Sequence, residues 1–147
     1  FLKVVEVSKK TSEKKKTNVI ALELPKGKII TGKQTDLLSP ASSVIINAIK
    51  ELSKIPDEIN LLSPTILEPI LKLRKNNNTL SLQEVLIALA VCSVTNPSIA
   101  SALEKLEVLK DCEAHATYIV TNGDLKALKS LKINLTCEPN FYSKEIM

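Results

Sequence analysis

The sequence predicts an α/β fold, a three-layer α/β/α sandwich whose mixed sheet opens with a β-hairpin. Stretches rich in β-branched residues alternate with stretches in which apolar residues recur every three to four positions. Strands that alternate with helices in this way favour a sheet with helices on both faces. The 147 residues correspond to about one domain, and the low aromatic content of 3% predicts an aliphatic core.

The first part of the chain is expected to form three strands. β-propensity marks residues 3–7, 17–23 and 28–32, and Pro25-Lys26-Gly27 supplies a tight turn between the last two. The lysine-rich run at residues 9–16 is interpreted as an exposed loop between strands. We disfavour a nucleic-acid patch there, because the run has no aromatic partner for stacking bases.

Two helices are expected to begin at Ser-Pro pairs. Ser39-Pro40 and Ser63-Pro64 each combine an N-cap serine with a proline at the first helical position. A short strand at residues 59–62 is expected to lead into the second helix, and Pro69 should kink it.

A third helix is predicted over residues 82–94, after a loop of asparagines at 76–78. Ser81 and Glu84 form a capping box at its start. This helix is apolar almost all round, so we predict that it is largely buried.

Helices and strands are expected to alternate again in the last third of the chain. Asn96-Pro97 begins a helix, and residues 115–120, 124–131 and 133–137 read as strand, helix and strand. We therefore expect five or six strands in all.

No complete catalytic motif is present, so whether the chain is an enzyme stays open. It lacks the phosphate-binding glycine loops, the G-x-S-x-G elbow, H-E-x-x-H and C-x-x-C. The single histidine, His115, is interpreted as structural rather than as a general base. Cys137 is interpreted as a small buried residue, with a reactive thiol as the alternative.

The cysteines and the hydropathy indicate a cytoplasmic protein. Cys92, Cys112 and Cys137 are an odd number and widely spaced, and the chain has neither a signal peptide nor an apolar run of about eighteen residues. We expect no bound metal, no cofactor and no membrane contact. Because the chain begins at Phe1 in strand-like alternation, we expect a further domain upstream of it.

Hydroxyl and amide side chains gather at the predicted helix starts. Helix N-termini at the carboxyl ends of parallel strands can hold an anion between free N–H groups. A small anion is therefore expected among Ser39, Ser42, Ser43, Ser63, Thr65 and Asn96, with Ser42 close to Thr65. Ordinary helix capping explains each residue separately, and this alternative is left open.

Several stretches together resemble a known bacterial family. They are TNVIALELP at 17–25, ITGK at 30–33, NLLSP at 60–64, EVLIAL at 84–89, TNP at 95–97 and NLTCEP at 134–139. They resemble the C-terminal domain of the family named domain of unknown function eighteen forty-six. The resemblance covers nearly the whole chain. It implies that residues 1–147 are a single C-terminal domain of a long cytosolic protein, whose absent upstream region resembles a nucleotide-binding domain with a glycine-rich loop.

The resemblance also implies a topology similar to that of cytidine deaminases. Zinc deaminases carry H-x-E or C-x-E at one helix start and P-C-x-x-C at a second. The corresponding stretches here read PASS at 40–43 and PTIL at 64–67, with no zinc ligand among them. The chain is therefore not expected to be a zinc deaminase.

Two functions remain for such a chain. The first is an accessory, regulatory or assembly domain that holds a small anionic ligand at converging helix starts. The second is a substrate- or phosphate-binding half-site, with the chemistry supplied by the upstream domain. Because no acid, base and nucleophile set can be assembled, the first is favoured. The oligomeric state is not predicted.

Overall fold

The computed structural model describes residues 2–74 and 79–138, so the asparagine loop expected at 76–78 lies outside the described residues. The helices are α1 (Leu2–Lys15), α2 (Pro40–Leu52), α3 (Pro64–Lys72), α4 (Leu82–Ser93), α5 (Pro97–Glu104) and α6 (Asn122–Ser130), with a short 3₁₀ helix, η1 (Lys105–Leu109). The strands are β1 (Val19–Glu23), β2 (Ile29–Lys33), β3 (Glu113–Ala116) and β4 (Asn134–Cys137).

The four strands form one mixed sheet in the order β2-β1-β3-β4. β1 pairs antiparallel with both β2 and β3, whereas β3 and β4 are parallel and are joined through α6. β2, β3 and β4 therefore run in the same direction, and their carboxyl ends lie at one edge of the sheet. We call this the carboxyl edge. The predicted hairpin is present, and Gly27 adopts a φ of 95° in its turn, which a side chain would disfavour.

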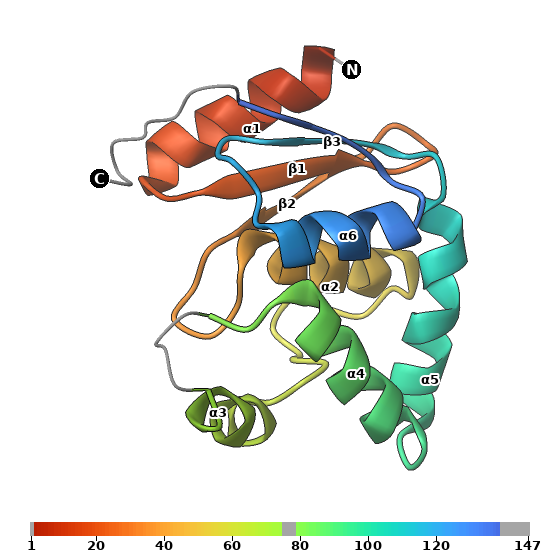
Figure 1. Cartoon of the computed structure of the whole chain (residues 1–147). Coiled ribbons are helices and arrows are strands. Elements are labelled where there is room, and N and C mark those ends of the chain that lie inside the picture. The colour runs from red at the N-terminus through yellow and green to blue at the C-terminus, as the bar shows by residue number, and fades with distance from the viewer. Residues whose placement is uncertain (1, 75–78, 139–147) are drawn as a thin grey trace.

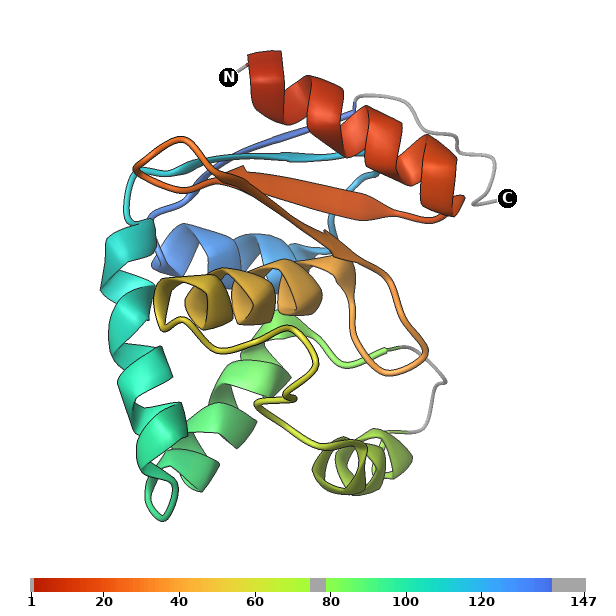
Figure 2. The same ribbon diagram turned by 180° about the vertical axis from the view of Figure 1, so that it is seen from behind.

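Helices lie on both faces of the sheet. Figure 1 shows α1 across one face, with α2 and α6 against the other, and the reverse view in Figure 2 shows the same layers. α4 and α5 lie beyond α2 and α6, while α3 lies apart from the sheet in both views. The predicted α/β class is confirmed. The finer likeness to cytidine deaminases stays a prediction.

The expected strand at residues 3–7 is wrong, because these residues lie in α1. The lysine run at residues 9–16 is likewise not a loop: it forms the second half of α1 and its end, although all of its lysines are exposed as expected. Val4 and Ser8, four positions apart, are buried against the sheet. The apolar residues of this stretch, such as Val4, fit a helix as well as a strand. The stretch is helical because its buried side covers one face of the sheet.

The expected strand at residues 59–62 is also wrong, so the sheet has four strands in the described residues rather than five or six. Residues 59–62 form bends. Leu61 and Leu62 are nevertheless buried in the core. Leu61 and Leu62 are buried by packing against the core and take no part in strand hydrogen bonding.

α4 is not buried all round, which corrects the prediction for this helix. Leu82, Val85, Ala88 and Leu89 are buried, but Ile87 is 57% exposed and Val91 67% exposed. One side of α4 packs on α2, α5 and α6, and the opposite side has no covering element among the described residues.

The main core lies between the sheet and α2. Gly32 of β2 approaches the backbone of α2 so closely that a Cβ built on it would lie 2.7 Å from Val44 Cβ and closer still to the Val44 amide nitrogen. Any residue other than glycine at this position would therefore collide with α2.

Candidate functional site

The starts of three helices meet at the carboxyl edge of the sheet, around an open pocket of about 770 Å³. The pocket is lined by Ser39 and Pro40 of α2, by Ser81, Gln83 and Glu84 of α4, and by Thr121, Gly123 and Asp124 of α6. α2 follows β2 and α6 follows β3, so the parallel direction of these strands brings both helix starts to one edge. Figures 1 and 2 both show the three starts converging below the sheet.

Backbone pairing explains why α4, which follows no strand, begins beside α2. Leu38 and Leu80 form a parallel bridge, with the Leu80 N–H donating to Leu37 O at 2.8 Å and the Ser39 N–H donating to Leu80 O at 3.1 Å. The Ser42 hydroxyl also donates to Leu80 O at 3.0 Å. The N-cap of α2 is thereby tied to the residue that precedes the N-cap of α4.

A buried carboxylate joins α6 to α4. Asp124 is 2% exposed, and its Oδ1 accepts a hydrogen bond of 2.8 Å from the Leu82 N–H in the first turn of α4. A negative charge is favoured at this place by the dipole of α4. Asp124 thus occupies the position in which a ligand anion would otherwise sit.

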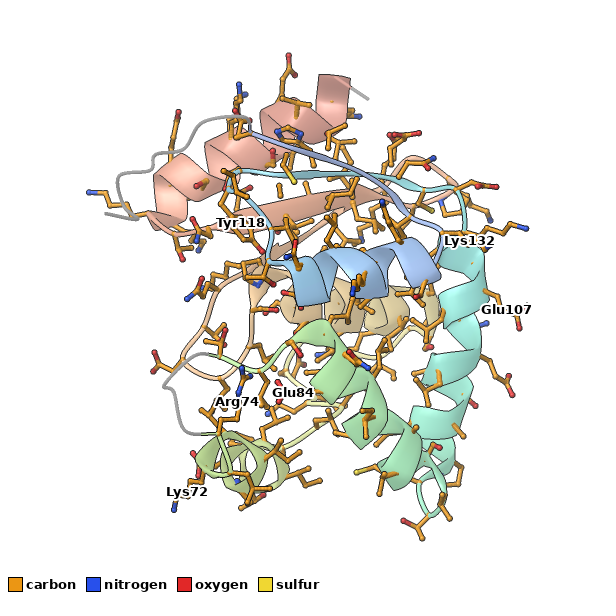
Figure 3. All side chains as sticks on the ribbon, viewed as in Figure 1. Lys72, Arg74, Glu84, Glu107, Tyr118 and Lys132 are labelled. Carbon is orange, nitrogen blue, oxygen red and sulfur yellow. The ribbon has the colours of Figure 1, made fainter. Side chains whose placement is uncertain are left out.

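The second carboxylate of the pocket is also engaged. Glu84 Oε1 accepts from the Ser81 N–H at 2.9 Å, which completes the predicted capping box, and from Arg74 Nη1 at 2.6 Å. Arg74 Nη1 also donates to Thr79 O at 2.9 Å. Figure 3 shows Arg74 and Glu84 facing each other across the space between α3 and α4.

Free donors remain at the start of α6. The N–H groups of Asn122 and Gly123 have no hydrogen-bond partner within residues 2–74 and 79–138, as expected for the first turn of a helix. A Cβ built on Gly123 meets nothing within 4 Å, so the backbone here is open to a ligand. Arg74 adds a positive charge to the same pocket, where it is paired with Glu84. The part of the pocket near α6 can therefore receive the negatively charged group of a small molecule.

Tyr118 follows β3 and lines the same pocket. Its hydroxyl is buried and has no hydrogen-bond partner among the described residues. Burial, followed by the nearby charges of Asp124 and Cys137, holds the pKa of Tyr118 well above its usual value.

Replacing Tyr118 by Phe should leave the free energy of unfolding at pH 7 unchanged or raise it by up to about 1 kcal/mol, because an unpartnered buried hydroxyl is removed. The raised pKa of Tyr118 also makes the free energy of unfolding of the wild-type chain depend on pH. Unfolded tyrosine ionises near pH 10, and the native state resists this ionisation, so stability is kept below about pH 10 and lost as the pH rises further. Urea unfolding at pH 7 and at pH 10.5 measures both effects. A loss above about 1 kcal/mol at pH 7 would show that the hydroxyl has a partner.

The structure does not bring the six predicted site residues together. Ser39 lines the carboxyl-edge pocket, and its Oγ accepts from the Ser42 N–H at 3.2 Å. Ser42 is fully buried behind it, and Ser43 lines a separate cavity of about 230 Å³ beside Lys50. Whether Ser39 contacts a ligand stays a prediction.

The other predicted residues lie at the starts of α3 and α5. The hydroxyls of Ser63 and Thr65 lie 2.7 Å apart, and Asn96 Oδ1 accepts from the N–H groups of Ser98 and Ile99. The reason for this placement is topological. No strand leads directly into α3, which follows α2. α5 begins at the far end of α4. Neither helix start therefore lies at the carboxyl edge (Figure 1).

The starts of α4 and α6 were missing from the prediction. Thr121 is the N-cap of α6 and accepts from the Asp124 N–H at 3.4 Å. Its signal was the capping pattern of a threonine followed by an aspartate three positions later. For α4 the capping box was recognised from the sequence. The position of this helix start beside α2 depends on the long-range bridge between Leu38 and Leu80, which no local sequence pattern indicates.

His115 and the cysteines lie outside this pocket. His115 is 5% exposed, with Nδ1 2.6 Å from Thr136 Oγ1 and Nε2 2.7 Å from Glu138 Oε2, so both ring nitrogens are engaged. All three cysteines, each within the described residues, are free thiols. Burial, and then the charges of Asp111, Glu23 and Glu113, raise the pKa of the Cys112 thiol.

Two absences concern only residues 2–74 and 79–138. No group of three or more His, Cys, Asp or Glu side chains is arranged there to hold a metal ion. No helix in these ranges combines the length and the apolar character that crossing a bilayer requires.

Fold and pocket together define an α/β domain with an open polar pocket at the carboxyl edge of its sheet. The family described as "Domain of unknown function DUF1846, C-terminal" matches residues 1–147, and the chain belongs to this family. The resemblance noted from the sequence is thus confirmed.

Related proteins are much longer than this chain. It is 46% identical over 133 residues to a UPF0371 protein of Clostridioides difficile, and this match covers 87% of the chain but 26% of the relative. A UPF0371 protein of Clostridium botulinum is 47% identical over 141 residues, with 92% of the chain and 28% of the relative covered. A UPF0371 protein of Clostridium tetani is 42% identical over 133 residues, again with 26% of the relative covered. The chain therefore spans less than a third of the length of these relatives.

Proposed function

We propose that this chain is the C-terminal accessory domain of a longer cytosolic protein, and that it holds a small ligand with a phosphate or carboxylate group in the carboxyl-edge pocket. One observation carries the proposal: the starts of α2, α4 and α6 converge on one pocket. Ligands of open α/β sheets bind outside the carboxyl ends of the strands. This pocket occupies that position.

The contacts within the pocket limit where the anionic group binds. The first turn of α4 already has Asp124 and Glu84 as acceptors, so a second anion beside them would be repelled. Among the described residues nothing accepts from the N–H groups of Asn122 and Gly123, and Arg74 has further N–H donors. Asp124 lies in the same turn of α6, but its carboxylate is bonded to the Leu82 N–H, so the anionic group is expected at the N–H groups of Asn122 and Gly123. The side-chain amides of Asn18 and Gln34 can bind the neutral part of the ligand.

A second candidate function is supported by the openness of the pocket. Ile87 and Ile119 line it and are 57% and 58% exposed, so one side of the pocket has no cover among the described residues. A half-site that is completed by another part of the longer protein would have this form. An assay of nucleotide hydrolysis by the full-length protein, with and without this domain, distinguishes this candidate from a purely accessory role.

Binding of inorganic phosphate tests the proposal. In the wild-type chain the melting temperature should rise with phosphate concentration and saturate, at constant ionic strength adjusted with chloride, because a ligand that binds the native state stabilises it. Gly123→Leu should abolish this rise, because a Cβ at this position meets nothing within 4 Å and the added side chain would occupy the space in front of the N–H groups of this turn.

The matched control is Ser101→Leu, at an exposed position of α5 outside the pocket. It should keep the full response to phosphate. No saturable response in the wild type, or an equal response in Gly123→Leu, would count against binding at this place.

A further inference from the structure

The exposed side of α4 carries no charge. It is formed by Gln83, Ile87, Ala90, Val91 and Val94, which follow one another at helical spacing, and we call it the outer face of α4. Val91 is 67% exposed and Val94 is 82% exposed. Single exposed apolar residues are ordinary, but a continuous apolar stripe marks an interaction surface.

The outer face of α4 is unusual in comparison with the composition of the whole chain and with the exposed side of α5. Charged residues are 24% of the chain, yet α4 contains only Glu84, which is paired with Arg74. On α5 the exposed positions include Ser98, Ser101 and Glu104, as a solvated helix requires. Apart from Gln83, the exposed positions of α4 are apolar, which is typical of a surface that is normally covered.

We propose that the outer face of α4 is the docking surface for the remainder of the longer polypeptide, which covers Ile87, Val91 and Val94. This inference rests on the proposed function in one respect, that the chain is one domain of a longer protein. Most of the length of the relatives lies outside the matched stretch, and the matched family is described as C-terminal, so a large region that could cover α4 precedes this domain in them. The absence of charge on the face excludes an acidic or basic partner and requires an apolar one.

The position of the face connects docking to the pocket. Ile87 belongs both to the outer face and to the wall of the carboxyl-edge pocket, where Ile119 also lies. A region that covers Ile87 and Ile119 closes the open side of the pocket. The docked region is thus in place to contribute residues to the ligand and to exclude water from it.

Alkylation of an introduced cysteine tests the docking surface. Val94→Cys is prepared in this chain and in the full-length polypeptide that contains it, and the rate of labelling by iodoacetamide at residue 94 is followed by tandem mass spectrometry. Labelling should be at least tenfold slower in the full-length polypeptide. Ser101→Cys, exposed on α5, should be labelled equally fast in both. Val94 is exposed, so the substitution does not disturb folding.

Two results would overturn the inference. Equal labelling of residue 94 in both polypeptides would show that the preceding region does not cover α4. Protection in the isolated chain that increases with its concentration, together with a dimer in light scattering, would assign the face to a second copy instead. Phosphate binding by the isolated chain is measured separately, so failure of the pocket and failure of the docking surface are distinguished.

Discussion

Gly32→Ala is expected to lower the free energy of unfolding by at least about 3 kcal/mol, because overpacking costs about 1–3 kcal/mol even where side chains can move aside. Here the obstacle is the backbone of α2, since a Cβ on Gly32 would lie 2.7 Å from Val44 Cβ and closer to the Val44 nitrogen. Relief would require α2 to move away from β2, and the start of α2 carries Ser39 to the pocket. Thermal unfolding should show a decrease of roughly 10 °C.

The matched control is Gly123→Ala. The same methyl group there meets nothing within 4 Å, and Gly123 lies in the first turn of a helix. This variant should be stabilised by about 0.5 kcal/mol, because alanine loses less backbone entropy in a helix than glycine. Equal stability of Gly32→Ala and wild type would show that β2 and α2 are farther apart than described.

Asp124→Ala is expected to reduce the free energy of unfolding by about 1.5–3 kcal/mol, the range for a hydrogen bond to a charged group. Asp124 is 2% exposed, and its carboxylate is bonded to the Leu82 N–H. Removal leaves this donor buried without an acceptor and separates the start of α6 from the start of α4. Urea unfolding measures the loss. Hydrogen exchange at the Leu82 amide should accelerate in the same variant.

Two comparisons make this prediction specific. Asp124→Asn keeps an oxygen acceptor at the same position and should lose less stability than Asp124→Ala. Asp36→Ala removes a carboxylate from an exposed loop, and its effect should stay within about 0.5 kcal/mol. If Asp36→Ala and Asp124→Ala were equally stable, the bond between α6 and α4 would not contribute to stability.

Local signals predicted most of the fold. The turn at Gly27, the Ser-Pro pairs at Ser39 and Ser63 and the capping box at Ser81 each depend on residues within one turn of the chain, and each lies where it was expected. The errors concern elements that tertiary packing decides. Val4 fits a strand or a helix by its own propensity, and the need to cover the sheet makes it helical.

The candidate site was harder to predict than the fold. Ser39 was identified because its helix follows a strand of the hairpin, but Ser63 was placed beside it through a strand at residues 59–62 that does not form. The residues that do meet Ser39, such as Ser81 and Asp124, are brought there by the Leu38–Leu80 bridge and by the side chain of Asp124. Contacts over such separations leave no periodic pattern in the sequence.

The bond between Asp124 and Leu82 also has a consequence for synthesis of the chain on the ribosome. The two residues are 42 positions apart, so the first turn of α4 emerges long before the carboxylate that completes it. Until then the Leu82 N–H lacks its acceptor and the nascent chain has only part of the pocket. A polypeptide truncated before α6 keeps the hairpin and α2 but has neither Asp124 nor β4. The first turn of α4 is therefore completed only after α6 has been synthesised.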